Sequence, residues 1–454
     1  MKMQLAEIAR SLRIEPKEEW EDISVTSVSF DSRSLKPGAL FIPITAGNDG
    51  HRFINNAQEN GAVATLWQED HTQVETQVPK LIVSNTIEAL QKLGKYYLEK
   101  INPGVVAVTG SNGKTTTKDM IAAILKTQFN VKKTHANFNN HIGVPMTILS
   151  MEPNTEILVV EMGMDHFGEL DQLSKLVNPD VAVITMIGEA HIEFFGNRGR
   201  IADAKMEIAH GLKEDGILVY NGDEPLLRER TAKLSQEKRT FGTSADDDLQ
   251  AANIVSDDVK TAFRVVAWEN TNFTIPMIGS YNVNNAMAAL AVGELYHIPI
   301  VKMQEALAKF DLTANRTEWV QGSKGERILS DVYNSNPTAV KEVLKAFSQV
   351  KTDGNRIAVL GDMLELGEQS EQMHVGLASS IDPEKITSVY LCGKMMEKLA
   401  ITLKQKYPEN KVHYYETTEK KQLIADLQAE VSKQDIVVIK GSHGIHLEEV
   451  LTNL

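Results

Sequence analysis

Residues 105–125 read VVAVTGSNGKTTTKDMIAAIL, and this stretch decides the fold of the middle of the chain. A short apolar run, a turn with two glycines and a helical pattern follow one another, which predicts a buried strand, a phosphate-binding turn and a helix. We expect Lys114 to reach the outer phosphates of a nucleotide and Thr115 to hold Mg²⁺. Val108 stands where the usual pattern has its first glycine, so the turn is a short form. The alternative is a glycine turn with a surface lysine.

Further apolar runs in the middle of the chain end, like the first, in a polar tip. They are EILVVEMG (156–163), VAVITMIG (181–188) and ILVYNGDE (217–224). Short, continuously apolar strands fit a parallel sheet that is covered on both faces. Because ligands gather at the carboxyl ends of such strands, the tips Thr109, Glu161, Thr185 and Asn221 should lie near one edge.

A second series of strand and helix patterns fills the last third of the chain. Its strands are RILSDVYN (327–334), RIAVLGDM (356–363), SVYLCGK (388–394), KVHYYE (411–416) and DIVVIKGSHG (435–444). Their alternation with helical stretches predicts a second doubly wound domain. The fold class is therefore α/β with three domains: 1–100, a central P-loop ATPase domain over 101–312, and a Rossmann-like domain over 313–454. The second boundary falls near Leu312.

Composition excludes several classes of protein. The 454 residues carry a formal net charge of -14, which argues against a nucleic-acid binder. No apolar run is long enough for a membrane span, and the first residues lack the layout of a secretory signal. The single cysteine, Cys392, fits a reducing compartment and is expected to end a strand as a structural residue. We expect a cytoplasmic protein.

Two further residues are metal candidates from their positions alone. Glu161 ends a buried strand, where a carboxylate is costly unless it meets a cation; a helix cap or an ion pair is the alternative. His191 follows another strand at the same expected edge, which favours a metal or substrate role over a structural one. Lys205 lies in a helical pattern that predicts only a solvated lysine.

Many ordered motifs in this chain resemble those of the Mur ligase family, the ATP-dependent amino-acid and peptide ligases of cell-wall synthesis. They are TGSNGKTTTK, NFNNHIGVP, VVEMGM, GEAHIEFFG, AKMEI, GSYNVNNAMAALAV, ANRTEW, DVYNSNPTA, LGDMLELG and KGSHG. The stretch FDSRSLKPGALFIPITAGNDGHRF resembles the uridine-nucleotide module, and DVYNSNPTA resembles members that add a dipeptide. Thr338 and Ala339 stand where an acidic residue and serine are common, and His443 stands where arginine is expected.

The resemblance implies roles for individual residues. Lys114, Lys205, His191 and Arg316 would be catalytic, and Thr115, Glu161 and His191 would bind Mg²⁺. Lys205 matches the lysine that carries a CO₂-derived carbamate. The ATP site would comprise Gly110, Ser111, Asn112, Gly113, Lys114, Thr115, Thr116, Asn282, Asn285, Arg316, Asp331, Tyr333, Asn334 and Asn336. The other substrates would meet Asp31, Ser32, Arg33, Asn139 and Asn140. For Asn282 and Asn285, helix capping is the alternative.

The resemblance also implies the reaction. The substrates would be ATP, D-alanyl-D-alanine and a UDP-N-acetylmuramoyl tripeptide, bound by residues 1–100 and joined through an acyl phosphate in peptidoglycan precursor synthesis. We expect a monomer that binds neither nucleic acid nor membrane. The rivals are a Mur-type ligase that adds a single amino acid and a regulatory P-loop NTPase. Both L-lysine and meso-diaminopimelate stay open as the third residue of the tripeptide.

Overall fold

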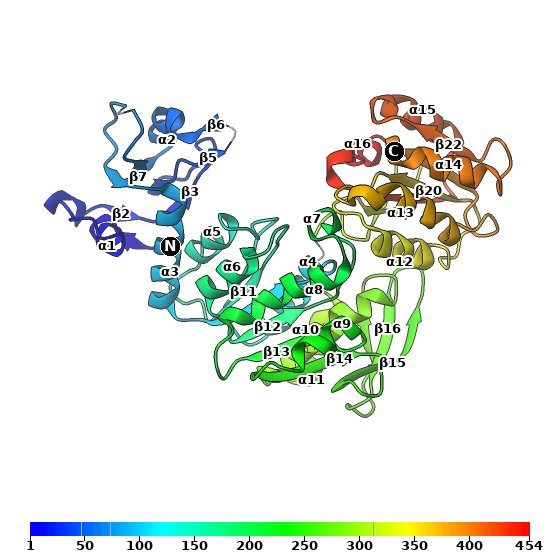
Figure 1. Cartoon of the computed structure of the whole chain (residues 1–454), viewed down its shortest axis with the longest axis horizontal. Coiled ribbons are helices and arrows are strands. Elements are labelled where there is room, and N and C mark those ends of the chain that lie inside the picture. Colours follow the sequence, from blue (N-terminus) through cyan, green and yellow to red (C-terminus); the bar gives the residue numbers. More distant parts are fainter. Residues whose placement is uncertain (47, 73, 312) are drawn as a thin grey trace. The chain divides into compact units, whose positions relative to one another are not determined.

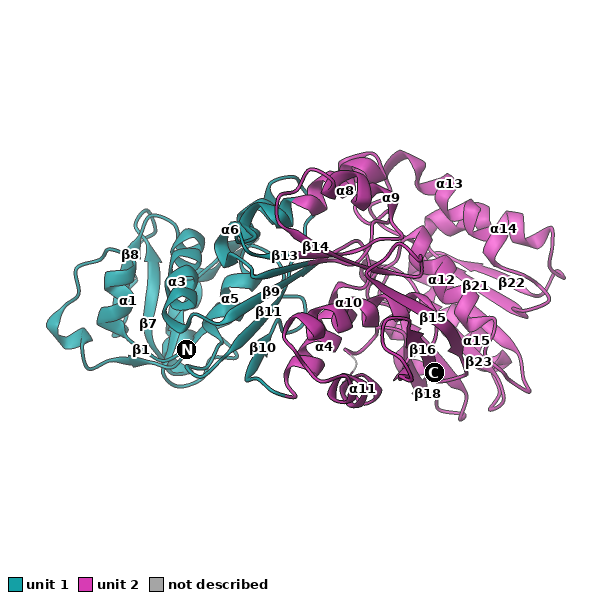
Figure 2. Cartoon of the chain, turned by 90° about the horizontal axis from the view of Figure 1, so that it is seen from below, with its two compact units in different colours: residues 1–108, 128–182, 207–217 teal, residues 109–127, 183–206, 218–454 magenta. Residues whose placement is uncertain are grey.

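The computed structural model describes residues 1–46, 48–72, 74–311 and 313–454. The expected boundary at Leu312 lies outside the described residues. The chain forms two compact units, coloured separately in Figure 2. Unit 1 comprises Met1–Val108, Gln128–Ala182 and Glu207–Ile217, and unit 2 comprises Thr109–Thr127, Val183–Met206 and Leu218–Leu454.

The first hundred residues of unit 1 form a four-stranded parallel sheet with helices. The sheet has the order β3 (Ser27–Ser29), β4 (Ala39–Phe41), β7 (Ala62–Gln68) and β8 (Lys80–Val83). Phe41 and Trp67 pack in its core with Ile54 and Ala57 of α2 (Ile54–Glu59). The helix α3 (Thr86–Ile101) then leads to the central sheet, and Asn85 caps its start by accepting hydrogen bonds from two backbone N–H groups.

The central strands follow the apolar runs predicted from the sequence. They are β9 (Gly104–Thr109), β11 (Ile157–Glu161), β12 (Val181–Ile184) and β13 (Ile217–Asn221). The sheet has the order β10-β11-β9-β12-β13-β14-β15-β16-β17, and its pairs β10–β11 and β11–β9 are parallel. Each of the four predicted runs ends in the polar residue expected there, or one residue before it in the case of Thr185.

The far end of this sheet was not predicted. β14 (Glu237–Gly242), β15 (Leu249–Ser256), β16 (Thr261–Val265) and β17 (Phe273–Ile275) extend it, and the pairs β15–β16 and β16–β17 are antiparallel. Residues along β16 alternate between buried and half-buried, so they form a one-sided strand rather than a continuously apolar one.

The C-terminal sheet confirms the second doubly wound series. Its order is β18 (Glu318–Gln321), β19 (Arg327–Asp331), β23 (Ile436–Lys440), β20 (Arg356–Gly361), β21 (Ser388–Cys392) and β22 (Val412–Tyr415). All of its pairs are parallel except β18–β19. Figure 1 shows its helices gathered around the sheet, among them α12 (Pro337–Phe347), α15 (Lys420–Glu430) and α16 (Glu448–Asn453). Cys392 ends β21 and is fully buried, as expected.

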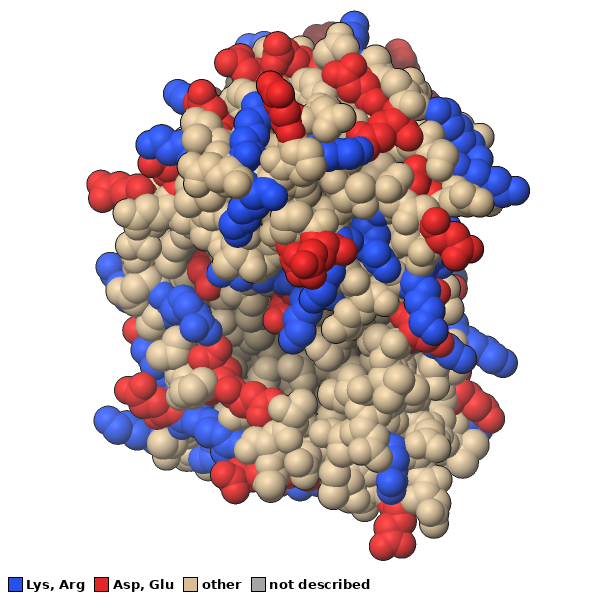
Figure 3. Space-filling model, turned by 90° about the vertical axis from the view of Figure 1, so that its right-hand side faces the viewer, with Lys and Arg blue, Asp and Glu red and all other residues tan. Residues whose placement is uncertain are grey.

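Two surface properties follow from the described residues. None of their helices is both long and apolar enough to cross a membrane. On the face drawn in Figure 3, Lys and Arg side chains are interspersed with Asp and Glu side chains. The negative net charge is therefore not gathered into one acidic patch on that face.

Candidate functional site

The turn between β9 and α4 (Lys114–Leu125) needs its two glycines. Gly113 caps the start of α4 with φ of 82°, and a Cβ there would lie 2.2 Å from Asn285 Oδ1. Gly110 has φ of 148°, and its Cβ would lie 1.8 Å from Thr185 Oγ1. Any side chain would therefore collide with a neighbouring polar group. The backbone is free to curl at the positive end of a twelve-residue helix, which is a suitable cradle for phosphate.

Cationic side chains lie beside this turn. Lys114 is half-buried, and its Nζ donates a hydrogen bond to the carbonyl of Gly110 at 2.8 Å. Arg316, just before β18, donates from Nη2 to the hydroxyl of Thr115 at 3.3 Å. Its guanidinium lies 3.9 Å from the centre of the Tyr333 ring, a cation–π contact. The structure thus brings Lys114, Thr115, Arg316 and Tyr333 of the predicted ATP set to one place.

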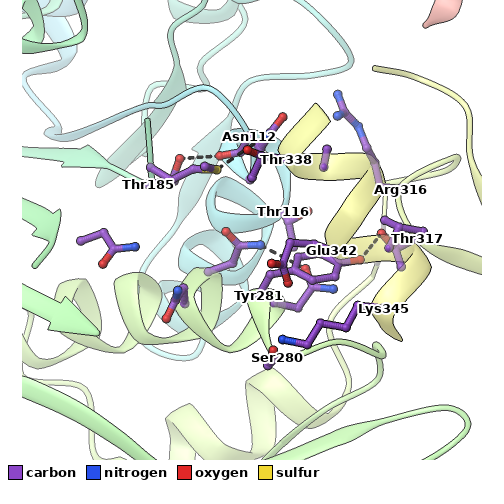
Figure 4. Close-up of a pocket in the computed structure, with 18 of the residues that line it drawn as sticks. Asn112, Thr116, Thr185, Ser280, Tyr281, Arg316, Thr317, Thr338, Glu342 and Lys345 are labelled. Atoms are coloured by element: carbon purple, nitrogen blue, oxygen red, sulfur yellow. Dashed lines mark hydrogen bonds between the residues drawn. The ribbon is translucent and has the colours of Figure 1, made fainter. Parts of the chain in front are cut away.

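A cavity of about 400 Å³ opens in unit 2 beside the same turn. Of the predicted ATP-site residues, it is lined by Asn112, Gly113, Thr116 and Asn282, and also by Asn285, Arg316, Asp331 and Asn334. Figure 4 shows Asn112, Thr185 and Thr338 near one another, with Tyr281, Thr317 and Lys345 on another part of the wall. Its size and mixture of polar groups suit a small polar ligand.

Asn282 and Asn285 do not cap α10 (Tyr281–Leu295), so the alternative interpretation of them is wrong. Both are buried within its first turns. Asn282 Nδ2 donates to the carbonyl of Ile278 at 2.9 Å, and Asn285 Nδ2 donates to Asn282 Oδ1 at 3.1 Å. Thr117 of α4 donates to Asn285 Oδ1 at 3.2 Å. This chain of hydrogen bonds holds α10 against α4, which begins at the glycine turn after β9.

Asn112 and Asn336 exchange two hydrogen bonds. Asn336 Nδ2 donates to Asn112 Oδ1 at 2.7 Å, and Asn112 Nδ2 donates to Asn336 Oδ1 at 3.2 Å. Asn336 also caps α12 by accepting from the backbone N–H of Ala339 at 3.0 Å. The two predicted ATP-site asparagines, far apart in the sequence, are therefore direct partners.

Lys440 and Asp331 form a buried ion pair at the cavity wall. They end the neighbouring strands β23 and β19, where they are register partners. Lys440 Nζ donates to Asp331 Oδ2 at 2.7 Å and to the carbonyl of Asn334 at 2.8 Å. Burial, and then the charge of Asp331, raise the pKa of Tyr281, whose hydroxyl lies 3.1 Å from Thr317 Oγ1. Tyr281 is thus a neutral hydrogen-bonding group.

A second buried carboxylate lies near another part of the cavity. Burial, and then the nearby charge of Asp223, raise the pKa of Asp247 to about 6. Arg228 lowers it in part, through a contact of 2.8 Å to Asp247 Oδ1. Asp223, which lines the cavity, accepts from the backbone N–H and hydroxyl of Thr243. The hydrogen bonds that Asp223 accepts tie the turn after β13 to Thr243.

His191 and Lys205 were both predicted to be catalytic. His191 is half-buried, whereas Lys205 is buried. His191 lies just before α7 (Ile192–Phe195) with φ of 63°, and its Nδ1 is 2.5 Å from Glu365 Oε2. Lys205 lies on α8 (Arg198–Met206) and is only 1% exposed. A lysine buried to this degree is not the solvated residue that its helical pattern predicted.

The other predicted residues belong to unit 1. Asn139 Nδ2 donates to Glu161 Oε1 at 2.9 Å, so a predicted substrate residue contacts a predicted metal ligand. Asn140 Oδ1 accepts from two backbone N–H groups at the start of α5 (Gly143–Leu149), which gives it a structural role as well. Arg33 is largely exposed and pairs with Asp31 at 2.9 Å, while Ser32 is buried.

Sequence reasoning missed several cavity residues. Tyr281 and Lys440 lie inside the motifs GSYNVNNA and KGSHG, so the motifs pointed to them without assigning a role. Glu342 and Lys345 lie on α12, and their spacing carries no signal beyond that of a helix surface. They reach the cavity only because α12 borders it.

Family models match three segments of the chain. The model described as Mur ligase family, catalytic domain, matches residues 24–98, the Mur ligase middle domain matches 108–293, and the Mur ligase, glutamate ligase domain, matches 315–443.

Individual relatives match over nearly the whole length. UDP-N-acetylmuramoyl-tripeptide–D-alanyl-D-alanine ligase of Bacillus subtilis is 41% identical over 451 residues, which cover 99% of this chain and 97% of the relative. The Escherichia coli enzyme of that name is 32% identical, with 95% and 94% covered.

Solved structures of proteins named MurF are similar to this chain over nearly its whole length. A crystal structure of MurF from Acinetobacter baumannii matches with a TM-score of 0.86 at 26% identity, covering 100% of this chain and 99% of that one. MurF ligase from Thermotoga maritima in complex with ADP matches with a TM-score of 0.81 at 29% identity, covering 94% and 97%.

Proposed function

The chain belongs to the Mur ligase family, and from this premise we propose that it joins D-alanyl-D-alanine to a UDP-N-acetylmuramoyl tripeptide at the expense of ATP. The observation that carries the proposal is the similarity to D-alanyl-D-alanine-adding ligases over 451 residues. A glycine turn at a helix start, beside a cavity of about 400 Å³, supports the nucleotide part of it. The enzyme would work in the cytoplasm, as a monomer, in peptidoglycan precursor synthesis.

The division of labour we propose follows three domains. Residues 1–100 would bind the uridine nucleotide through Asp31, Ser32 and Arg33. Residues 101–312 would bind ATP, and residues 313–454 would complete the ATP site with Arg316, Asp331, Tyr333, Asn334 and Asn336. Asn139 and Asn140 would contact the tripeptide side.

The reaction must first activate a carboxylate, which is a poor electrophile in water. In the proposed route the terminal carboxylate of the tripeptide attacks the γ-phosphorus of ATP, ADP leaves and an acyl phosphate forms. The amino group of D-alanyl-D-alanine then attacks the acyl carbon and inorganic phosphate leaves. Such phosphoryl transfer needs mainly positioning and charge neutralisation.

The chain's own residues supply that positioning. The backbone N–H groups from Gly110 to Thr116 would cradle the phosphates, and Lys114 would neutralise charge on the oxygens of the transferred group. Arg316, stacked on Tyr333, would place a second cation there. Asn282 and Asn285 would border the adenine.

The residues that we propose as ligands are of the types that suit Mg²⁺. The hydroxyl of Thr115 and the carboxylate of Glu161 are the oxygen donors that Mg²⁺ prefers, and both side chains are buried. Together with His191 they would hold the ion, which supplies neutralisation of phosphate charge. Lys205, as a carbamate, would add a negative group in place of a buried cation.

A ligation assay tests this proposal. The protein is incubated with ATP, Mg²⁺ and the tripeptide nucleotide carrying either L-lysine or meso-diaminopimelate, together with D-alanyl-D-alanine or with single amino acids. We expect a pentapeptide product only with the dipeptide, and transfer of ¹⁸O from the tripeptide carboxylate to inorganic phosphate. Ligation of single amino acids, or phosphate release without the tripeptide, would replace our assignment with one of its rivals.

A further inference from the structure

The loop that carries His191 is held at several points by C-terminal segments of unit 2. Glu193 donates its backbone N–H to the carbonyl of Glu365 at 3.0 Å. Gly367, with φ of 61°, approaches so closely that a Cβ there would lie 3.2 Å from the Cα of Glu193. Glu189, at the start of the loop, accepts from the backbone N–H and the hydroxyl of Thr338 at 3.2 and 3.1 Å. The backbone around Glu365 is therefore anchored next to His191.

The side chains of Glu365 and His191 meet within this contact. His191 Nδ1 is buried from solvent and lies 2.5 Å from Glu365 Oε2, which is an ion-pair distance, although the two atoms do not meet the angles of a hydrogen bond. Among the residues that the structure describes, no hydrogen bond or ion pair is formed by Nε2. A carboxylate next to one ring nitrogen favours a proton on that nitrogen and leaves the other as the acceptor.

Both residues adopt backbone conformations that L-residues rarely use. His191 has φ of 63° and Glu365 has φ of 62°. Each such conformation is strained and persists only where the surroundings hold it. A chance surface pair between two flexible side chains would require neither.

We propose that Glu365 is the positioning residue for His191: its carboxylate would accept the Nδ1 proton and leave Nε2 as the nitrogen that would hold the metal ion. This inference rests on the proposed function, because it assumes that His191 is a metal ligand. It gives the motif LGDMLELG, for which the sequence assigned no role, a task in the ATP site. Carboxylates that orient a ligating histidine in this way change metal affinity by about 10- to 100-fold.

The first experiment reads the tautomer directly. Full-length protein with ¹⁵N-labelled histidine rings is studied by long-range ¹H–¹⁵N NMR, and the His191 signals are identified by their loss in His191→Asn. We expect neutral His191 to carry its proton on Nδ1. Glu365→Gln, which keeps an acceptor oxygen, should preserve this form, and Glu365→Ala should shift the ring toward the Nε2–H form. A proton on Nε2 in the unsubstituted protein would overturn the proposal.

The second experiment measures metal affinity without turnover. Free Mn²⁺ is followed by electron paramagnetic resonance in the presence of ADP. Glu365→Ala should weaken Mn²⁺ binding about 10-fold, while Glu365→Gln should weaken it less. Glu368→Ala, an exposed acid three residues later, is the matched control and should leave it unchanged. Equal affinity in Glu365→Ala and Glu368→Ala would overturn the proposal.

Neither measurement involves an acceptor or the tripeptide. A wild-type protein that has the expected tautomer and Mn²⁺ affinity but fails to ligate D-alanyl-D-alanine would contradict the proposed function alone. A protein that ligates but has the opposite tautomer would contradict the role of Glu365 alone.

Discussion

Two turns in unit 2 leave the carboxyl end of a parallel strand with a lysine, yet the two lysines are used differently. After β9, Lys114 begins a long helix, is half-buried and bonds the carbonyl of Gly110 in its own turn. At the end of β23, Lys440 is 2% exposed and bonds the carboxylate of Asp331. The first turn is built around glycines whose close neighbours allow no side chain, and the second is built around a buried ion pair.

The difference teaches what each lysine can do. A half-buried ammonium at a glycine turn can exchange its carbonyl partner for a phosphate oxygen. A buried ammonium that neutralises a buried carboxylate cannot leave without removing the partner of that buried charge. Lys114 is therefore suited to catalysis and Lys440 to holding Asp331 in place.

The largest effect is expected at the glycine turn. Lys114→Ala should lower the rate of ligation about 1000-fold while the melting temperature stays close to that of wild type, because the side chain stabilises transferred charge rather than a core. Phosphate release and product formation measure the rate, and circular dichroism follows melting. Lys126→Ala, an exposed lysine at the end of the same helix, should be fully active. Near-normal ligation by Lys114→Ala would break the comparison.

Replacing the buried Lys440 should have the opposite kind of effect, a loss of stability. Lys440→Met leaves Asp331 without its cation and should lower the free energy of unfolding by about 3 kcal/mol, measured by urea denaturation. Adding Asp331→Asn should recover part of that loss, and Lys433→Met, at an exposed position, should have little effect. If the free energy of unfolding lost in the double variant equals the sum of the losses in the two single variants, the ion pair does not explain the effect of Lys440→Met.

Lys205 sharpens the comparison because it is buried but proposed to be chemically modified. Lys205→Ala should slow ligation about 100-fold, since it removes a negative group that helps to hold Mg²⁺. Added acetate or formate should restore part of the rate by taking the place of the carbamate. Exposed Lys233→Ala serves as the control. A fully active Lys205→Ala would remove the carbamate from the mechanism.

The smallest effect concerns Asp247, where burial and the charge of Asp223 outweigh the charge of Arg228. With its pKa raised to about 6 in the folded protein, its contribution to stability is complete at low pH and is lost as the pH rises toward 6. The free energy of unfolding should therefore fall by about 2 kcal/mol between pH 4 and 7 from this group.

The Asp247→Asn variant isolates that contribution. It should lack this part of the pH dependence, which urea denaturation at a series of pH values would measure. Asp246→Asn, at an exposed neighbouring position, should keep the wild-type profile. An Asp247→Asn profile identical to wild type would show that folding does not raise the pKa of this carboxylate.

A contrast between local features and contacts of distant segments explains what the sequence could predict. Continuously apolar runs identified β9, β11 and the C-terminal strands because a doubly covered strand has no polar face. The glycine turn was visible because its spacing is local. β16 was missed because its alternating residues lack that signature, and the contact of His191 with Glu365 was missed because it joins distant segments. Sequence spacing within one element cannot report such a contact.

The reciprocal amide pair of Asn112 and Asn336 has an energetic consequence for any nucleotide. Each side chain already satisfies the other, so a ligand that needs either amide must first separate the two. Part of its binding free energy is spent on that separation, and its apparent affinity falls below what its own contacts would provide. Replacing one of these asparagines with a residue that cannot pair would tighten the binding of a ligand that uses only the other.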